Sequence, residues 1–260
     1  MLLALGAATA LPLRAQFLTY GAEGKDAPWV PTPDEVAVRM LAMARTTAAD
    51  RVVDLGSGDG RIPTIAAARF GARALGIEYE KEMVEHARRR AREAGLADRV
   101  EFRQGDVLEE DFSDASVVTV YLTTSLNIRL RPRILALRPG TRVVAHEYGF
   151  GEEWEADEVG FEADRRVLLW IVPAQVAGIW RLEGGELAIR QRFQRIEGSY
   201  RRGGETQPLR GARLRGDRVS FALAAGRDER SFYGRVTGAA LQGVATDGES
   251  SDRFHATRQA

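Results

Sequence analysis

The sequence predicts an α/β protein in which a doubly wound parallel sheet is followed by a small antiparallel all-β domain. Two observations predict this fold class. Short apolar runs alternate with helical patterns between residues 51 and 147, which is the order of βαβ units. After about Pro173 the helical patterns end, and 13 of the 27 glycines fall in the last 87 residues, where they separate short alternating runs. We therefore expect two domains, at residues 51–173 and 174–260.

The parallel sheet is predicted from apolar runs that are too short to be helices. The run at 116–122 is β-branched, which is typical of a buried parallel strand. Pro139 and Gly140 end the last helix before the fifth strand. The predicted strands are 51–55, 72–78, 100–104, 116–122 and 142–147, and the helices between them are 62–70, 81–94 and 127–137. Ligands of such sheets bind at the carboxyl ends of the strands, so the residues that follow each strand are the candidates for a site.

The last 87 residues show the period of two that is typical of strands. The predicted strands are 179–182, 187–193, 219–223, 231–236, 241–245 and 253–256. Glycine-rich turns separate them at the spacing of a sandwich or a barrel, as at 184–185, 203–204 and 247–248. This segment is therefore predicted to fold as an antiparallel β domain.

The charge balance and the absence of cysteine exclude several function classes. The chain has 260 residues with 37 basic and 37 acidic side chains, so its formal net charge is zero. Binders of nucleic acids and anionic membranes need a basic surface, so we expect no nucleic-acid partner for the chain as a whole. There is no cysteine, and the three histidines, His86, His146 and His255, are widely spaced, which predicts that there is no metal site.

The zero net charge hides a separation of charge along the chain. Up to Asp164 there are 20 basic and 27 acidic residues, and after it 17 basic and 10 acidic residues. The acidic part suits a cationic ligand, whereas the basic β part suits either the acidic part or an anionic partner. An anionic partner of the C-terminal domain therefore stays open.

Residues 1–15 have features of a signal peptide. Residues 1–13 are uncharged and rich in Leu and Ala, and Ala15 precedes Gln16 as a small residue precedes a cleavage point. The basic stretch that normally begins a signal peptide is missing, so the alternative is a helix that packs on the domain. Export to the periplasm and a cytoplasmic location are the two corresponding expectations. No later apolar run reaches about 18 residues, so no transmembrane segment is predicted.

A glycine-rich loop follows the first predicted strand. Asp54 lies near the end of the strand, and Gly56, Ser57 and Gly58 follow. Glycines let the backbone approach a ligand closely, but the dinucleotide fingerprint needs a third glycine at position 61, which is arginine here. The acids Asp54 and Asp59 disfavour a pyrophosphate and favour a cationic ligand with a free amino group. The pattern therefore favours S-adenosylmethionine (SAM) over NAD or FAD.

The next two strand ends also carry acids. Glu78 ends the second strand, 20 residues after Gly58, where a carboxylate can accept both hydroxyls of a ribose. Asp106 follows the third strand and is expected to accept the amino proton of adenine, while the backbone N–H of Val107 donates to the ring. Each acid alone is more simply a solvated loop residue or a helix cap. Three of them on consecutive strand ends indicate one binding site.

These residues resemble class I, seven-strand SAM-dependent methyltransferases over about residues 27–173. A closer resemblance is to the lysine methyltransferases that modify the mitochondrial ATP synthase c-subunit and the adenine nucleotide translocase, and to their bacterial relatives. The segments that carry it are 29–33 (WVPTP), 54–61 (DLGSGDGR), 118–125 (VTVYLTTS), 130–137 (LRPRILAL) and 140–144 (GTRVV). The resemblance implies a Rossmann-like methyltransferase sheet with SAM as its cofactor. In that family a proline normally stands where this chain has Thr124, and the last 87 residues have no counterpart in the mitochondrial enzymes.

Residues at the ends of the fourth and fifth strands are the candidates for catalysis. Tyr121 is expected beside the transferred methyl group and the cofactor, the alternative being a core aromatic residue. Thr123 follows it, and His146 is a candidate base, the alternative being a structural hydrogen-bond donor. In the family that the chain resembles, the segment with Thr32 closes over the methionine end of SAM. Residues 16–50, with a helix predicted at 35–44, are therefore expected to cover the cofactor.

The expected function is methyl transfer from SAM to an acceptor nucleophile, either a protein lysine amine or a small molecule. Methyl transfer is an in-line displacement, so the protein mainly has to align the donor and the acceptor. The alternative is an exported binding protein of the same fold whose β domain binds a ligand or a cell-envelope partner without catalysis. The acids Asp54, Glu78 and Asp106 favour the enzyme, and export favours the alternative.

Overall fold

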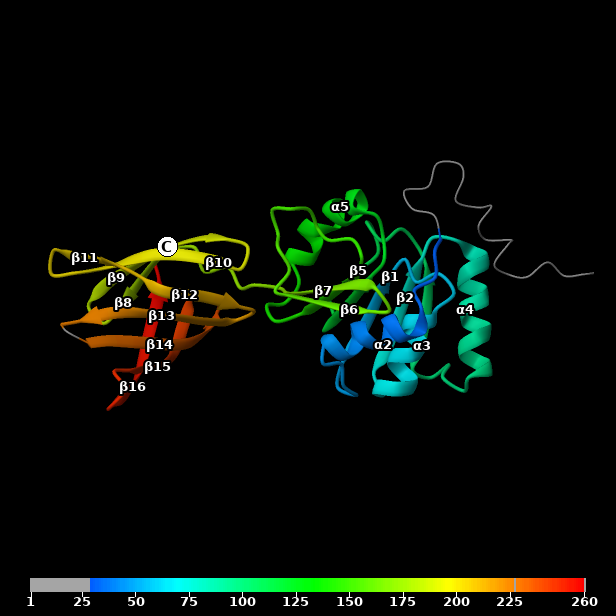
Figure 1. Cartoon of the computed structure of the whole chain (residues 1–260), viewed down its shortest axis with the longest axis horizontal. Helices are drawn as coiled ribbons and strands as arrows, with labels where there is room; N and C mark the ends of the chain where they lie inside the picture. The colour runs from blue at the N-terminus through cyan, green and yellow to red at the C-terminus, as the bar shows by residue number, and fades with distance from the viewer. Residues whose placement is uncertain (1–28, 227, 260) are drawn as a thin grey trace, which may run out of the picture.

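The chain forms two β-sheets that lie side by side along the long axis of the molecule (Figure 1). The computed structural model describes residues 29–226 and 228–259. The predicted signal peptide at 1–15 and the start of the predicted cover, 16–28, lie outside these residues. Within the described ranges, one sheet is a mixed sheet of seven strands and the other is an antiparallel sheet of nine. This is the fold class that the sequence predicts.

Five parallel strands and an antiparallel pair make up the first sheet, in the order β3-β2-β1-β4-β5-β7-β6. The parallel strands are β1 (Arg51–Leu55), β2 (Arg73–Glu78), β3 (Val100–Gln104), β4 (Val117–Val120) and β5 (Arg142–His146). The antiparallel pair is β6 (Glu158–Glu162) and β7 (Arg165–Ile171), which sequence analysis leaves unassigned. The strand order reverses between β1 and β4, so a ligand site is expected at the carboxyl edge there.

Buried aliphatic side chains explain why the central strands form. All residues of β4 are buried, and in β1 and β5 every residue except the first is buried. This burial is expected of a parallel sheet that is covered on both faces. The predicted fourth strand, 116–122, is longer than β4, because Tyr121 and Leu122 already belong to the turn that leads into the next helix.

In the part of the chain that the structure describes, four helices connect or cover these strands. They are α2 (Asp34–Met43), α3 (Arg61–Phe70), α4 (Lys81–Glu93) and α5 (Thr124–Leu135). The range predicted for α2 is shifted by one residue at both ends, and those for α3 and α4 differ by one residue at one end. The range predicted for α5 starts three residues late and ends two residues late. Thr123 caps α5, and its Oγ1 accepts from the backbone N–H of Leu126 at 3.4 Å. The described helices include none that is long and apolar enough to cross a membrane.

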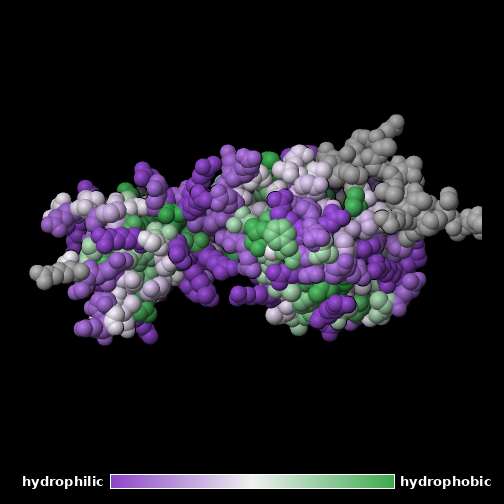
Figure 2. Space-filling view, in the orientation of Figure 1, coloured by the Kyte–Doolittle hydropathy of each residue, from purple (hydrophilic) through white to green (hydrophobic). Residues whose placement is uncertain are grey.

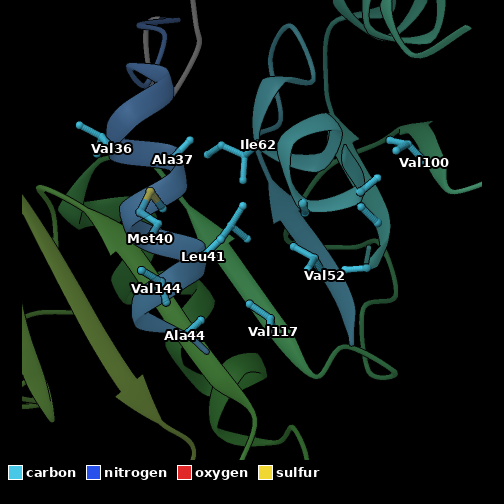
Figure 3. Close-up of a cluster of buried hydrophobic side chains, with 14 of the residues drawn as sticks. Val36, Ala37, Met40, Leu41, Ala44, Val52, Ile62, Val100, Val117 and Val144 are labelled. Carbon is cyan, nitrogen blue, oxygen red and sulfur yellow. The ribbon is translucent and has the colours of Figure 1, made fainter. Parts of the chain in front are cut away.

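Helix α2 packs its apolar side on the first sheet and thereby fixes the chain that precedes it. Val36, Met40 and Leu41 are fully buried in a cluster that also contains Val144 of β5 and Ile62 of α3. Figure 3 shows these side chains between the helix and the strands. Since α2 is held in this way, the residues just before it are placed at the carboxyl edge of the sheet.

Strand β6 forms a free edge of the first sheet. Gly160 at its centre faces Arg39 and Met43 of α2, because a Cβ there would lie 2.9 Å from the Arg39 guanidinium and 3.3 Å from the Met43 sulfur. Side chains alternate along a strand, so Val159 and Phe161 point to the opposite face. Their exposed fractions are 53% and 65%, so this edge presents apolar surface to solvent.

The second sheet is antiparallel and has the order β11-β10-β9-β8-β16-β15-β14-β13-β12. Its strands are β8 (Gly178–Leu182), β9 (Gly185–Arg192), β10 (Arg195–Arg202), β11 (Glu205–Pro208), β12 (Arg210–Arg215), β13 (Arg218–Ala225), β14 (Asp228–Thr237), β15 (Ala240–Thr246) and β16 (Ser251–Arg258). The six predicted strands correspond to β8, β9 and β13 to β16. Strands β10 to β12 are missed because they contain few apolar residues at alternate positions.

The second sheet curls toward a barrel. Strand β10 contacts β12 and β11 contacts β13, although the edge strands β11 and β12 do not pair with each other. Gln207 of β11 bridges this seam with side-chain hydrogen bonds to the backbone N–H and C=O of Ala224 in β13, at 2.7 and 3.3 Å. Apolar side chains fill the interior, among them Trp180, Tyr200, Phe221, Phe232 and Phe254.

A small set of contacts joins the two sheets. Phe193, in the turn between β9 and β10, stacks on Trp154 with ring centroids 5.8 Å apart. Next to it, the side chain of Gln194 donates to the carbonyl of Glu155 at 2.7 Å, and Arg195 forms an ion pair with the Glu155 carboxylate. These contacts join residues on either side of residue 173. Since strands β1 to β7 pair only within the first sheet and β8 to β16 only within the second, we keep 51–173 and 174–260 as the proposed domains.

Candidate active site

The loop after β1 is shaped by glycines in the left-handed backbone region. Gly56, Gly58 and Gly60 have φ angles of 78°, 52° and 76°. Space is also limited, since a Cβ on Gly58 would lie 2.4 Å from Nε1 of Trp29. The indole of Trp29, from the segment before α2, therefore packs directly on the loop. A side chain at position 58 would force the two apart.

Asp54 of β1 presents a buried carboxyl group at the start of this loop. It is 3% exposed and accepts a hydrogen bond from Oγ1 of Thr119 in β4 at 2.6 Å. Burial raises the pKa of Asp54 to about 7 against the opposing effect of the Thr119 hydrogen bond, and the carboxylates of Glu78 and Asp59 add to the shift. A cation bound beside Asp54 would favour its ionised form.

Glu78 at the end of β2 contacts the glycine loop directly. Its Oε2 accepts from the backbone N–H of Gly58 at 2.8 Å, and its Oε1 accepts from that of Glu80 at 3.0 Å. Burial raises the pKa of Glu78, while these backbone hydrogen bonds act in the opposite direction. The acid predicted to bind a ribose and the loop predicted to approach the ligand thus lie side by side.

Three further predicted residues lie along the same edge. Asp106 is partly buried in the turn after β3, where its Oδ1 accepts from the N–H of Leu108 at 2.8 Å, and Val107 beside it is buried. Ser57 lies over β2, since a Cβ on Gly76 would be 2.6 Å from its Oγ. This Oγ is buried and has no hydrogen-bond partner among the described residues. Buried polar groups are usually paired, so Ser57 is a candidate to bind a ligand.

His146 at the end of β5 and Thr32 before α2 are in contact, although 114 residues separate them. Nδ1 of His146 lies 3.1 Å from Oγ1 of Thr32, and both side chains are buried. Nε2 of His146 is buried without a hydrogen-bond partner in the described ranges. Burial lowers the pKa of His146 to about 4, so its imidazole is neutral at pH 7.

Tyr121 completes an aromatic wall, formed by Tyr121, His146 and Tyr148. The ring centroid of Tyr121 is 4.0 Å from that of His146 and 6.2 Å from that of Tyr148, whose plane is tilted by only 8° from its own. Burial raises the pKa of Tyr121, and Tyr148 adds to this effect, so the hydroxyl keeps its proton at neutral pH. Sequence analysis missed Tyr148, although an aromatic residue just beyond a strand end is a usable signal.

The start of α5 supports this wall. Oγ1 of Thr123, which caps the helix, lies 3.1 Å from Oγ of Ser125. Asn127 is fully buried, and its Nδ2 donates to the backbone carbonyl of Tyr148 at 2.9 Å. Its Oδ1 is buried without a partner in the part of the chain that is described. Asn127 therefore helps to fix the position of Tyr148.

Exposed apolar side chains follow the same strand ends. They come from the segment before α2, the loop after β2, the first turns of α5 and the loop after β5. Their exposed fractions are 40% to 64%, and we call these four side chains the apolar rim: Val30, Tyr79, Ile128 and Tyr148. Of the nine large hydrophobic residues that are exposed within the described residues, four thus belong to one edge of one sheet.

The structure corrects the interpretation of Asp59. Its carboxylate forms ion pairs with Arg61 at 2.7 Å and Arg90 at 2.9 Å, so it is already balanced by two guanidinium groups. Arg61 also donates to the backbone carbonyl of Thr32 at 2.8 Å and so ties the segment before α2 to the loop. The electrostatic case for a cationic ligand therefore depends on Asp54 and Glu78 alone.

Comparisons with known proteins show relatives that are methyltransferases. The model of the ANTKMT methyltransferase domain matches residues 54–158. A protein-lysine N-methyltransferase of Saccharolobus islandicus (strain REY15A) is 41% identical over 134 residues, which are 51% of this chain and 83% of the relative. A lysine N-methyltransferase of Mus musculus that acts on the ATP synthase c-subunit is 32% identical over 171 residues, which are 64% of this chain and 67% of the relative.

A solved structure with a similar fold is also a methyltransferase. The crystal structure of an RNA methyltransferase from Salinibacter ruber, in complex with S-adenosyl-L-homocysteine, is 47% identical to this chain. The match covers 56% of this chain and 96% of that chain, with a TM-score of 0.55. Because the chain shares the domain and spans most of these relatives, it belongs to the ANTKMT family of SAM-dependent methyltransferases.

Proposed function

We propose that the chain transfers a methyl group from SAM to the side-chain amine of a lysine in a partner protein. Two relatives are lysine N-methyltransferases, which supports this acceptor. The observation that carries the proposal is the apolar rim around a buried, neutral imidazole. A small-molecule acceptor is the second candidate.

The residues assigned to the cofactor fit its chemistry. SAM carries a sulfonium cation, an amino group and an adenosine. The site offers the buried carboxyl group of Asp54, the partly buried one of Glu78, a loop with three glycines and the hydroxyl of Ser57, which has no partner among the described residues. We assign to the cofactor Thr32, Asp54, Gly56, Ser57, Gly58, Glu78, Asp106, Val107 and Tyr121. Of these, Glu78 is assigned to the ribose, Asp106 and Val107 to adenine, and Thr32 to the methionine end.

The apolar rim offers the apolar and aromatic surface that a lysine of a partner protein can contact. The methylene groups of a lysine are stabilised by contact with apolar surface, and its ammonium group is attracted to aromatic faces. Tyr148 is 46% exposed and stacks on Tyr121, which contacts His146. These rings therefore lead from solvent to the buried end of β5. Clustered exposed apolar side chains are also typical of protein interaction sites.

The pKa of His146 defines its part in the reaction. With a pKa of about 4, His146 would hold a proton taken from a lysine only weakly, so we do not assign it as the base. With its proton on Nδ1, His146 donates to Thr32 and leaves Nε2 as a hydrogen-bond acceptor. We assign Nε2 to orient the N–H of a neutral lysine amine, which loses its proton to solvent before it attacks.

Tyr121 and Thr123 are the other two proposed catalytic residues. Bound SAM supplies a methyl group that is already activated by the sulfonium, so alignment is the main task of the chain. Tyr121 limits the position of the acceptor nitrogen through its ring and its protonated hydroxyl. Thr123 places a second hydroxyl at the start of α5, beside Ser125.

RNA is the competing acceptor, because the Salinibacter ruber relative is described as an RNA methyltransferase. The test incubates the full chain with SAM that carries an isotope-labelled methyl group, together with RNase-treated cell proteins, protein-free total RNA or a protein-free extract of small molecules. We expect label in methyllysine after hydrolysis of the proteins, measured by mass spectrometry. Label in the RNA alone, or in small molecules alone, would contradict the proposal.

Two variants test whether the apolar rim contributes to the methylation of proteins. Tyr148→Ala is expected to reduce protein labelling about tenfold, because it removes an aromatic face for the ammonium and part of the rim. Binding of SAM should stay unchanged. Phe161→Ala is the matched control, because Phe161 is also an exposed aromatic residue of the first sheet but lies on β6. Equal labelling by the two variants would show that the apolar rim does not bind the acceptor.

The non-catalytic alternative gains no support from these comparisons. The relatives and the solved structure reported above are all methyltransferases. Asp54 and Glu78 also lie near each other, and Glu78 accepts from the glycine loop, which supports the enzyme.

A further inference from the structure

The outer face of the second sheet carries a groove of about 610 Å³ that runs across strands β12 to β15. Hydrophilic residues cover much of the visible surface of this sheet (Figure 2). Basic side chains dominate the groove, which contains no Asp or Glu in its lining. The lining includes Arg213, Arg215, Arg218, Tyr233, Arg235 and Val244.

The register of the strands places like charges opposite one another. Arg215 of β12 pairs with Arg218 of β13, and Arg218 pairs in turn with Arg235 of β14. Neighbouring strands are only about 4.8 Å apart, and like charges directly opposite each other destabilise a sheet. Among these three arginines, Arg235 alone forms an ion pair with a described residue, to Asp217 at 2.7 Å. Arg215 is also attracted to the Asp157 carboxylate. Arg218, in the middle of the row, therefore keeps a positive charge that a densely charged anion would offset.

An aromatic ring lies in the same groove. Tyr233 is 58% exposed, and its cross-strand partners are Ser220 and Val244. Residues at 213, 220, 233 and 244 follow one row across four strands, beside the row of arginines. The groove thus combines guanidinium groups with a flat apolar face that solvent can reach.

We propose that this groove binds single-stranded nucleic acid. Guanidinium groups match the paired oxygens of a phosphate, and an exposed ring gives an unpaired base a stacking surface. An acidic peptide or an anionic lipid surface would use the arginines but would gain no base stacking from the ring. The expectation of no nucleic-acid partner used the charge of the whole chain, whereas this groove lies in the basic part of it.

This inference does not depend on the proposed methyl acceptor, because the groove lies on the second sheet and its test needs no SAM. The full chain is titrated into a fluorescein-labelled single-stranded oligouridine, and binding is followed by anisotropy at several salt concentrations. We expect saturable binding at low salt, with an affinity that falls linearly in a plot of log Kd against log salt. Absence of binding at about 50 mM salt would overturn the proposal.

Removal of two arginines tests the phosphate contacts. Arg213 and Arg218 form no ion pair with a described residue, so their loss should leave the fold intact. The Arg213→Ala, Arg218→Ala double variant should bind about tenfold more weakly or worse, and its salt slope should fall by about 0.7 for each lost phosphate contact. The control is Arg181→Ala, Arg190→Ala, which removes the same charge from β8 and β9, outside the groove. An equal loss in the control would show nonspecific attraction only and would contradict a site in the groove.

Replacement of the ring separates a nucleic acid from other anions. Tyr233→Leu keeps an apolar side chain but removes the stacking surface, so oligouridine should bind about 5- to 150-fold more weakly. The salt slope should not change, because no phosphate contact is lost. Polyglutamate and anionic vesicles, at the same charge concentration, are added as competitors to test an acidic protein or a lipid surface as the ligand. Equal competition together with no effect of Tyr233→Leu would assign the groove to an acidic protein or a lipid surface and would overturn the proposal.

Discussion

Asp54 and His146 are both buried at the carboxyl edge of the first sheet, and burial moves their pKa values in opposite directions. The carboxyl group of Asp54 becomes harder to ionise, and the imidazole of His146 becomes harder to protonate. Both shifts reduce the charge that the site carries before a ligand binds. A cationic cofactor then favours ionisation of Asp54, so binding and proton release are coupled.

Stability should depend on pH through Asp54. Its folded-state pKa, about 7, lies above the ordinary value of 3.8. The contribution of the protonated group to stability is therefore complete below about pH 4 and is lost as the pH rises to about 7. Asp54→Asn does not titrate, so its free energy of unfolding should exceed that of the wild type by an amount that grows up to about pH 7. Urea denaturation from about pH 5 to about pH 8.5 without SAM measures this difference, and a constant difference would refute the assignment.

Glu78 should contribute to cofactor affinity through its charge. Glu78→Gln keeps the shape of the side chain but loses the charge-assisted hydrogen bonds assigned to the ribose. We expect SAM to bind more weakly by about 1–3 kcal/mol, as measured by isothermal titration calorimetry. Glu82→Gln removes an exposed charge from the first turn of α4 and is the matched control. An unchanged affinity of the Glu78 variant would place the ribose elsewhere.

At the scale of elements, helices and strands with a clear apolar pattern could be predicted from the sequence, and those without one could not. The strands of the parallel sheet are short apolar runs between helices, and their acids could therefore be placed at one edge. Strands β10 to β12 could not be found, because few of their residues are apolar, and the polar residues at 123–125 hid the start of α5. The contact of Thr32 with His146 joins residues 114 positions apart, and no local pattern encodes it.

The glycine loop and the segment before α2 should be sensitive to one methyl group. Gly58→Ala adds a Cβ at a φ of +52° and 2.4 Å from the Trp29 indole. Gly95→Ala is the matched control, since Gly95 has a φ of +69° and nothing lies within 4 Å of its Cβ position. Both variants should lose about 1 kcal/mol from backbone strain, and Gly58→Ala should lose more because of the clash. Thermal unfolding measures both losses, and equal values would show that Trp29 does not pack on the loop.

At the scale of the whole molecule, two sheets of different character are joined through few side chains. The first sheet binds its ligand at the carboxyl ends of its strands, whereas the second carries its charged groove on an outer face. The family relationship accounts for the first sheet. The second sheet adds surface that is separate from the methyl-transfer site. The excess of basic residues after Asp164 is the sequence feature that indicates this charged surface.

The stack of Phe193 on Trp154 should stabilise the junction of the two sheets. Phe193 also lies beneath the guanidinium of Arg131, which is 5.5 Å from its ring centroid. Phe193→Ala should lower the free energy of unfolding by about 1–2 kcal/mol and should speed limited proteolysis between residues 173 and 177. Phe161→Ala, at an exposed position, should change neither. Identical proteolysis of the two variants would count against a stabilising junction.

The free edge formed by β6 has a consequence for behaviour at high concentration. Val159 and Phe161 make this edge attractive to a second copy, and an antiparallel pairing centred on Gly160 would extend the sheet across two molecules. That pairing sets Glu158 of each copy opposite Glu162 of the other, so two carboxylate pairs repel where the strands would join. Colloidal stability of the purified protein should therefore decrease when salt screens these glutamates.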